Sequence, residues 1–366
     1  MAMALELARK AIGLAEPNPR VGCVLVDPQG GVIGSGHTQA VGGPHAEIMA
    51  LRDATARGHT SVGATAYVTL EPCSHHGRTG PCCDALVAAG VRRVVASIAD
   101  PNPLVGGQGF ARLRAAGVAV TVGPGAAESR ELNIGFFSRM LRKTPWVRMK
   151  VAASLDGRTA LDNGASQWIT GPLARADGHA WRARACVILT GIGTVRDDNP
   201  RLDVRLDAPV HRQPHLVVVD SRLETPPQAQ LFDAQRKVTL YAATLPQDAM
   251  AALAARGAEV VAMPASAPGS LAKVDLKAML ADLARRETNE VHVEAGHKLN
   301  GSLIREGLVD ELLVYLAPKL IGQGRGMAHF GPLATLEQSL ALEFHSTAMV
   351  GPDLRILARI RGSAQF

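Results

Sequence analysis

Two short stretches determine the expected fold of the first part of this sequence: His45-Ala46-Glu47, and Pro72-Cys73-Ser74-His75-His76-Gly77-Arg78-Thr79-Gly80-Pro81-Cys82. They supply one imidazole and two thiols, which are ligand types that zinc takes in proteins. With His45, Cys73 and Cys82 as ligands, the fourth tetrahedral position stays open for water, as in a catalytic zinc site. Glu47 is then free to move protons. The sequence therefore predicts one zinc ion per chain, with Glu47 as the catalytic residue.

Two other interpretations of these residues stay open. His75 or Cys83 could complete a closed structural zinc site, and without metal Cys73 would be a small buried side chain. Cys23 and Cys186 lie in or at the start of apolar runs, so they are expected, like Cys83, to pack in cores. Five cysteines, an odd number, do not form a disulfide framework, which favours metal binding in a reducing compartment.

The surrounding residues predict a strand–loop–helix arrangement for the site. The apolar run Ala64–Leu70 is a predicted buried strand that ends just before Cys73, where α/β folds place ligand sites. Predicted helices over His45–Ala56 and Pro81–Ala89 put His45 and Cys82 at helix starts, where free N–H groups and the helix dipole favour a thiolate. The remaining elements expected in this part are a helix to about Leu14, strands over Val21–Val26, Val32–Gly34, Val91–Ile98 and Val118–Val122, and helices over Phe110–Ala116 and about Ala126–Leu141.

A break at Lys143-Thr144-Pro145 divides the chain into predicted domains 1–144 and 145–366. Strands and helices alternate again in the second domain, which indicates another α/β layer structure. The expected strands are Trp146–Ala152, Cys186–Thr190, His215–Asp220, Val238–Tyr241, Glu259–Met263, Val291–Glu294 and Glu311–Leu316, with Leu342–Arg361 pairing at the end. The expected helices are Pro172–Ala185, Ser270–Arg286 and Lys298–Glu306.

Three motifs resemble a known family. They are Pro17-Asn18-Pro19-Arg20-Val21-Gly22, the run from Thr69 to Thr79, and Ser154-Leu155-Asp156-Gly157-Arg158-Thr159, and together they resemble the bifunctional deaminase/reductase of riboflavin biosynthesis. The H-x-E and P-C motifs are similar to those of zinc nucleobase deaminases, although eight residues separate Cys73 from Cys82 where the short form has two. The resemblance extends to Leu320. It implies a cytidine-deaminase-like, three-layer α/β/α first domain and a dihydrofolate-reductase-like α/β second domain.

The resemblance implies two activities. The first domain would deaminate 2,5-diamino-6-(5-phosphoribosylamino)pyrimidin-4(3H)-one by zinc-dependent hydrolysis. The second would reduce the ribosyl side chain of 5-amino-6-(5-phosphoribosylamino)uracil to ribityl with NADPH. Two alternatives remain, a zinc nucleoside or tRNA-adenosine deaminase with an accessory domain, and a non-catalytic RNA-binding zinc protein. The long cysteine spacing and the Ser154–Thr159 motif argue against the first, and an aromatic content of 4% argues against the second.

For the first domain, the resemblance assigns Asn18 to recognition of the pyrimidine, because an amide both donates and accepts hydrogen bonds. It brings Arg78 near the ribose phosphate, where a guanidinium suits the dianion. The family often has an aromatic–histidine pair after a Gly-x-Gly, whereas here Gly34-Ser35-Gly36 is followed by His37-Thr38. The sequence does not decide whether His37 or Thr38 makes that contact.

The second domain lacks a GxGxxG after a predicted strand, so it has no Rossmann fingerprint. Glycines instead follow two strands, at Gly191-Ile192-Gly193-Thr194 and Glu294-Ala295-Gly296, where N–H groups can approach a pyrophosphate. By resemblance, the NADPH site is lined by Ala153, Trp168, Thr194, Asp198, Ser221, Gly296, His297, Lys298, Leu299, Asn300, Gly301 and Ser302. The sugar-phosphate substrate would be held by Lys150, Asp156, Ser166, Arg182, Leu202, Arg205 and Glu294.

The composition is that of a globular protein, with 366 residues of which 47% are hydrophobic and 20% charged. A net charge of +6 suggests anionic partners, and scattered basic residues with few aromatics argue against nucleic acid. The resemblance implies that the partners are small phosphorylated pyrimidines. No apolar run is long enough for a membrane span, and the first residues lack a signal-peptide layout. We expect a cytoplasmic enzyme that forms a homo-oligomer, without a membrane or nucleic-acid partner.

Overall fold

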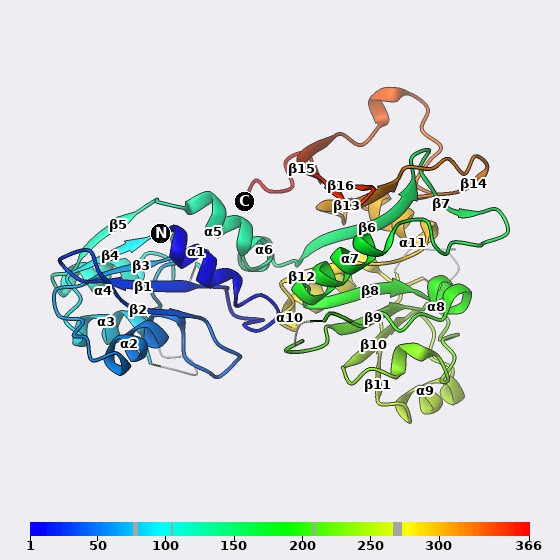
Figure 1. Cartoon of the computed structure of the whole chain (residues 1–366). Helices are drawn as coiled ribbons and strands as arrows, with labels where there is room; N and C mark the ends of the chain where they lie inside the picture. Colours follow the sequence, from blue (N-terminus) through cyan, green and yellow to red (C-terminus); the bar gives the residue numbers. More distant parts are fainter. Residues whose placement is uncertain (76–79, 104, 208–209, 266–272) are drawn as a thin grey trace. The chain divides into compact units, whose positions relative to one another are not determined.

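The computed structural model describes residues 1–75, 80–103, 105–207, 210–265 and 273–366 (Figure 1). The chain forms two compact units, Met1–Lys143 and Thr144–Phe366. The division falls within the Lys143-Thr144-Pro145 segment. Among the described residues, no helix combines the length and the apolar character that crossing a membrane requires. Each unit is described separately below.

The first unit is a mixed sheet with helices. Its strands are β1 (Gly22–Val26), β2 (Val32–His37), β3 (Thr65–Val68), β4 (Arg93–Ala96) and β5 (Ala119–Val122). Its helices are α1 (Ala2–Arg9), α2 (Ala46–Ala56), α3 (Cys82–Ala88), α4 (Gln108–Ala115), α5 (Ala126–Leu132) and α6 (Ile134–Arg142). The strand order within the described residues is β2-β1-β3-β4-β5, with β1 antiparallel to β2 and β3, and β3, β4 and β5 parallel.

Helices cover both faces of this sheet. A Cβ at Gly22 would lie 1.9 Å from the Ala4 carbonyl oxygen in α1, and one at Gly36 would lie 2.4 Å from Met49 Cβ in α2. Gly36 pairs with Cys23, the neighbour of Gly22, so the two glycines face opposite sides of the sheet. The first unit is therefore a three-layer α/β/α structure, as expected.

Two predicted helices of this unit are wrong in extent. The opening helix ends at Arg9 rather than near Leu14, because the chain tightens into i→i−3 hydrogen bonds, such as Ala11 N–H to the Ala8 carbonyl at 3.1 Å. The single helix expected over about Ala126–Leu141 is broken into α5 and α6 at Asn133, whose φ of −111° is not helical. The Asn133 side chain bonds to a distant backbone segment, and this contact accompanies the break.

The second unit is also an α/β structure. Its strands are β6 (Trp146–Ser154), β7 (Arg158–Leu161), β8 (Val187–Gly191), β9 (His215–Val219), β10 (Val238–Ala242), β11 (Ala258–Ala262), β12 (Glu290–Val293), β13 (Glu311–Ala317), β14 (Gly324–Gly326), β15 (Leu342–Val350) and β16 (Asp353–Ile360). Its helices are α7 (Pro172–Arg184), α8 (Ile192–Asp198), α9 (Gln247–Ala254), α10 (Leu276–Arg285) and α11 (His297–Arg305), with 3-10 turns at Gln230–Phe232 and Leu336–Gln338.

The large sheet of this unit has the order β11-β10-β9-β8-β12-β6-β13-β16-β15 among the described residues. The strands from β11 to β13 are parallel, and the β15–β16 hairpin is antiparallel. The carboxyl ends of parallel neighbours open at the same edge of a sheet, which is where α/β folds hold their ligands. The residues that follow β8, β9 and β12 therefore come together, and α8 and α11 begin there.

The sequence patterns miss several elements of this unit. Helix α9 and the two-stranded β7–β14 sheet are not predicted. The helix expected over Ser270–Arg286 begins only at Leu276, where the Asp275 side chain caps it by accepting the Ala278 N–H at 2.8 Å. Residues 270–272 of that predicted helix lie outside the described residues.

Candidate functional site

The zinc ligands predicted in the first unit lie together. His45 is the extended residue that precedes α2, Cys82 is the first residue of α3, and Cys73 follows the end of β3. His45 Nδ1 lies 3.6 Å from Cys73 Sγ and 3.4 Å from Cys82 Sγ, and the three ligand atoms lie within 4.8 Å of one another. The Cys82 N–H also donates to Cys73 Sγ at 3.3 Å, which stabilises negative charge on that sulfur.

This arrangement fits a tetrahedral zinc ion. Zinc–sulfur bonds of about 2.3 Å and zinc–nitrogen bonds of about 2.0–2.1 Å at a tetrahedral angle put nitrogen and sulfur roughly 3.6 Å apart. The two separations from Nδ1, 3.6 and 3.4 Å, match that value. The hydrogen bond with Cys82 and the neighbouring His45 lower the pKa of Cys73, which favours a thiolate at this ligand.

Glu47 lies in the first turn of α2 and is buried, with 3% of its surface exposed. Burial, and then the charge of Cys73, raise the pKa of Glu47 to about 7. A carboxyl group with such a pKa exchanges protons readily near neutral pH. The arrangement is therefore three candidate zinc ligands with one buried acid/base beside them.

The sequence patterns miss a second carboxylate next to this centre. Glu71, two residues before Cys73, accepts backbone N–H groups of Asp100 (3.1 Å), Gly107 (2.9 Å), Gly109 (2.9 Å) and Phe110 (3.2 Å). It thereby holds the loop before α4 against the Pro72–Cys73 segment. The position of Glu71, at a strand end near a candidate ligand, can be recognised in the sequence. Its backbone partners cannot, because they are distant in the chain.

The structure describes some of the other residues of the first unit that are expected to contact the substrate. Asn18 is half-buried in the loop before β1, and within the described residues its side chain makes no hydrogen bond. The Thr38 hydroxyl is buried and accepts the Val21 N–H at 3.2 Å, whereas His37 is half-buried. Arg78 lies outside the described residues. The cysteines expected to be packed, Cys23, Cys83 and Cys186, are buried.

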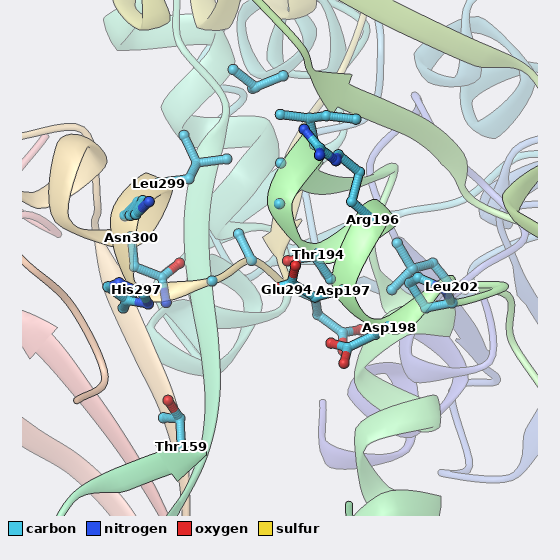
Figure 2. Close-up of a pocket in the computed structure, with 18 of the residues that line it drawn as sticks. Thr159, Thr194, Arg196, Asp197, Asp198, Leu202, Glu294, His297, Leu299 and Asn300 are labelled. Atoms are coloured by element: carbon cyan, nitrogen blue, oxygen red, sulfur yellow. The ribbon is translucent and has the colours of Figure 1, made fainter. Parts of the chain in front are cut away.

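The second unit contains a cavity of about 2450 Å³ at the carboxyl edge of its parallel strands. Figure 2 shows His297, Leu299 and Asn300 on one side, Asp197, Asp198 and Leu202 on the other, and Thr194 and Glu294 between them. Most of the expected ligand residues line this cavity: Lys150, Ser166, Trp168, Arg182, Thr194, Asp198, Leu202, Arg205, Ser221, Glu294, Gly296, His297, Lys298, Leu299, Asn300 and Ser302. The residues predicted to bind NADPH and those predicted to bind the sugar phosphate therefore line the same cavity.

Three expected residues do not line the cavity. Ala153 is fully buried in β6, and Gly301 packs so closely that a Cβ there would lie 1.9 Å from the His329 carbonyl oxygen. Asp156 accepts the backbone N–H groups of Ile321 (3.1 Å) and Gly322 (2.7 Å). It therefore tethers one loop to another.

A half-buried ionic cluster forms the floor of the cavity. Glu294 forms a two-point ion pair with Arg182, one contact being Nη2 to Oε2 at 2.9 Å, and Lys150 Nζ lies 3.7 Å from Oε2. Burial alone would raise the pKa of Glu294, but the charges of Arg182 and Lys150 hold it well below its usual range. Burial lowers the pKa of Lys150. Ion pairing thus holds Glu294 beside the cavity, with Lys150 and Arg182 as its partners.

His179, on the helix face of Arg182, was not predicted. It lines the cavity, and its Nδ1 accepts the Arg205 N–H at 3.1 Å, so in the neutral ring the proton is on Nε2. Burial and the charges of Arg182 and Arg205 lower the pKa of His179 to about 4. Two guanidinium groups and one neutral N–H donor therefore converge at this end of the cavity. The i, i+3 spacing of His179 and Arg182 was visible in the sequence.

The cofactor residues expected from the glycine joints follow two strands. Thr194 and Asp198 lie on α8, directly after β8, and Gly296 precedes α11, directly after β12. Trp168 is 65% exposed, and the Arg175 guanidinium carbon lies 4.5 Å above its ring. Ser221 follows β9 and its hydroxyl accepts the Val274 N–H at 3.3 Å. Helix starts and a flat ring around a large cavity are features that bind dinucleotides.

Family models match both units. Residues 1–98 match the cytidine and deoxycytidylate deaminase zinc-binding region, and residues 145–356 match the RibD C-terminal domain. The zinc-ligand cluster lies in the first match, and the cavity lies in the second.

Relatives match along almost the whole chain. Riboflavin biosynthesis protein RibD of Escherichia coli is 44% identical over 97% of this chain and 96% of that protein. The structure of Acinetobacter baumannii RibD is 38% identical with a TM-score of 0.88, covering 98% of this chain and 97% of that one. The Thermotoga maritima diaminohydroxyphosphoribosylaminopyrimidine deaminase/5-amino-6-(5-phosphoribosylamino)uracil reductase is 31% identical with a TM-score of 0.85, with the same coverage. The chain therefore belongs to the RibD family of riboflavin biosynthesis proteins.

Proposed function

We propose that this protein is a bifunctional enzyme of riboflavin biosynthesis, which deaminates a phosphorylated diaminopyrimidine in its first unit and reduces the product in its second. The observation that carries the proposal is the cluster of His45, Cys73 and Cys82 beside the buried Glu47, in a chain that also has a large cavity at the sheet edge of its other unit. RNA binding by a structural zinc site would need neither the open ligand position nor the second cavity.

The deamination replaces the 2-amino group of 2,5-diamino-6-(5-phosphoribosylamino)pyrimidin-4(3H)-one with oxygen from water. A zinc ion held by His45, Cys73 and Cys82 supplies activation of water at neutral pH. Glu47 takes a proton from the attacking water and passes it to the ring nitrogen. It then takes the proton of the newly formed hydroxyl group and gives it to the leaving nitrogen as the carbon–nitrogen bond breaks, so that a carbonyl forms and ammonia departs. The burial of Glu47 supports this acid/base role.

Binding of this substrate falls to residues around the centre. Asn18 would pair with donor and acceptor groups of the pyrimidine, because its amide makes no hydrogen bond within the described residues. Arg78 would contact the ribose phosphate. His37 is a better candidate than Thr38 for the family's histidine contact, since the Thr38 hydroxyl already bonds to Val21. Among the described residues, the His37 ring makes contacts only through Nδ1, to the Thr38 carbonyl at 3.1 Å and to Gln39, which leaves Nε2 for a ligand.

The reduction converts the ribosyl group of 5-amino-6-(5-phosphoribosylamino)uracil to ribityl. NADPH supplies a hydride for C1′, and one proton completes the reduction. The cofactor would lie along Trp168, Thr194, Asp198, Ser221 and the 296–302 segment, with its phosphates near the glycine joints.

The sugar-phosphate substrate would lie at the other lining residues. Lys150 and Glu294 on the cavity floor would orient the opened ribose, with Ser166 and Leu202 beside it. Arg182, Arg205 and the Nε2–H of His179 would hold the phosphate. Ala153, Asp156 and Gly301 would act through the backbone or through packing, because they do not line the cavity.

We also propose that the enzyme is cytoplasmic, acts on small phosphorylated pyrimidines rather than nucleic acid, and forms a homo-oligomer. None of its five cysteines forms a disulfide, which suits a reducing compartment. The segment 333–349 exposes Leu336 (87%), Phe344 (76%) and Met349 (64%), a surface that a second copy would cover. Light scattering of the purified protein measures the oligomeric state. A monomer at micromolar concentration would contradict the proposed homo-oligomer.

Product identification by mass tests the two-step reaction. The zinc-loaded protein is given the diaminopyrimidine phosphate without NADPH and then with NADPH. The proposal predicts the deaminated compound alone in the first case and the ribityl compound in the second. An unchanged substrate in both cases contradicts it, and so does a deaminated compound that NADPH never converts.

A further inference from the structure

The helix pair α5–α6 lies between the two regions that family models match. The first match ends at residue 98 and the second begins at 145. Within this interval the helix is interrupted at Asn133. Asn133 has only 3% of its surface exposed. A buried polar side chain needs hydrogen-bond partners, and the partners of Asn133 show which segments the helix pair holds.

Asn133 bonds to the backbone of Arg20 in both directions. Its Oδ1 accepts the Arg20 N–H at 2.7 Å, and its Nδ2 donates to the Arg20 carbonyl at 3.0 Å and to the Ser129 carbonyl at 3.2 Å. The buried amide of Asn133 thus bonds to both the N–H and the carbonyl of Arg20, as a neighbouring strand would. The contact joins residues that are 113 positions apart in the sequence.

The same helix pair holds the residues on either side of Asn18. The Arg20 guanidinium donates to the Leu132 carbonyl at 3.0 Å and to Glu16 Oε1 at 2.6 Å. Arg139 of α6 donates to the Pro17 carbonyl at 3.3 Å. The loop 16–20 is therefore anchored before and after Asn18, and the Asn18 amide is left for a ligand.

This loop leads to the strand that lies beside the segment before Cys73. It leads into β1, whose first residues lie beside the end of β3: Cys23 pairs with Val68, and the Gly22 N–H donates to Thr69 Oγ1 at 3.1 Å. Cys73 follows four residues after Thr69. Ser129 of α5 donates to the Thr69 carbonyl, so the helix pair contacts the two segments that lead to Asn18 and to Cys73.

We propose that Asn133 is a positioning residue of the deaminase site, and that α5–α6 is a built part of that site rather than a linker. Asn133 holds the 16–20 loop at the distance from the metal centre at which Asn18 meets the pyrimidine. The inference rests on the proposed function through the role of Asn18. It assigns to Asn133 an effect on substrate binding and none on the metal or on proton transfer by Glu47.

The test is a double-mutant cycle in the full-length, zinc-loaded protein, with Asn133→Asp, Asn18→Ala and the double variant. Asn133→Asp keeps the Oδ1 acceptor for the Arg20 N–H but replaces the Nδ2 donor with an oxygen that faces the Arg20 and Ser129 carbonyl oxygens, so this half of the contact is lost. We expect the deaminase KM to rise roughly three- to tenfold, the effect of about one hydrogen bond, with zinc content and kcat preserved. In the Asn18→Ala background the same change should have almost no further effect on KM, because the residue being positioned is gone.

Two controls separate positioning from general destabilisation. Val94→Ala removes a buried methyl pair in β4 of the same unit and should lower the melting temperature without changing KM. Reductase kinetics of the same chain should stay constant throughout. Arg139→Ala, which removes the contact with Pro17, replaces Asn133→Asp if the latter does not fold.

The outcomes distinguish the inference from the function on which it rests. If Asn18→Ala leaves KM unchanged, the proposed role of Asn18 fails and the inference falls with it. If Asn18→Ala raises KM but Asn133→Asp and Arg139→Ala do not, only the inference is overturned. It is also overturned if the effects of Asn18→Ala and Asn133→Asp on KM are independent, or if Val94→Ala raises KM equally.

Discussion

The metal centre and the cavity are built in different ways. The centre takes its three ligands and its acid/base from two short stretches, 45–47 and 73–82, and positions them at two helix starts and one strand end. The cavity takes side chains and backbone from residues as far apart as Lys150 and Met327. Few residues of fixed chemical type make the first site, whereas many residues of ordinary type make the second. Single substitutions should therefore abolish the first activity and only weaken the second.

The largest effect is expected from Cys73→Ser. Removing one of three ligands should release the zinc and reduce deamination to background, because the remaining His45 and Cys82 give an incomplete site. Zinc content by atomic absorption and deaminase rate are the measurements. Cys83→Ala is the matched control and should keep its zinc. Loss of zinc from Cys83→Ala would indicate a closed four-ligand structural site.

Glu47→Gln should separate metal binding from chemistry. The amide keeps the shape of the side chain but cannot carry the proton, so the rate should fall at least about 100-fold while zinc content stays constant. Reduction of the deaminated compound by the same preparation serves as the internal control. A near-normal deamination rate would remove Glu47 from the mechanism.

A smaller effect is expected in the cavity. Arg205→Ala should raise the KM for the sugar phosphate by roughly ten- to a hundredfold, since a charged hydrogen bond contributes about 1.5–3 kcal/mol. The KM for NADPH should stay constant. Arg285→Ala, an exposed arginine of α10 outside the cavity, is the matched control. Equal weakening of both substrates would place Arg205 on the cofactor side.

The smallest effect is a pH dependence confined to the second unit. Burial lowers the pKa values of His179 and His215 to about 4, whereas in the unfolded chain they are about 6.5. The unfolded chain binds more protons between these values, so their contribution to stability is complete above about pH 6.5 and is lost as the pH falls towards 4. The loss should be about 1–2 kcal/mol for each histidine after allowance for partial exposure.

Tryptophan fluorescence measures this dependence in the intact chain, because all three tryptophans, Trp146, Trp168 and Trp181, lie in the second unit. His215→Gln should reduce the slope of stability against pH between these two pKa values. A slope that is the same in the variant would mean that other groups titrate on unfolding.

The sequence predicts the metal centre better than its surroundings. His45, Cys73 and Cys82 were predicted because catalytic zinc restricts ligand type, and the structure brings them together. The break of the 126–141 helix was not predicted, because it depends on a contact between Asn133 and Arg20 that no local pattern contains. Glu71 was missed for the same reason, since its four partners are backbone groups of a distant loop and of the first turn of α4.

The α/β class of the second unit followed from the alternation of strands and helices, but the details of its cavity did not. Its floor depends on the pairing of Glu294 with Arg182 and Lys150, which the sheet order brings together from β12, α7 and β6. Asp156 was assigned to the ligand by its motif, yet it does not line the cavity and holds residues 321–322. A motif identifies an important residue without saying whether it contacts the ligand.

Zinc removal tests the central claim most directly, namely that one chain holds two sites of which only the first needs metal. The full-length protein is treated with a chelator, and its two reactions are followed in parallel by product mass. Deamination should stop and return when zinc is added back, while reduction of the deaminated compound with NADPH should continue at the untreated rate. Deamination that survives complete removal of zinc, or reduction that is lost with it, would contradict the account.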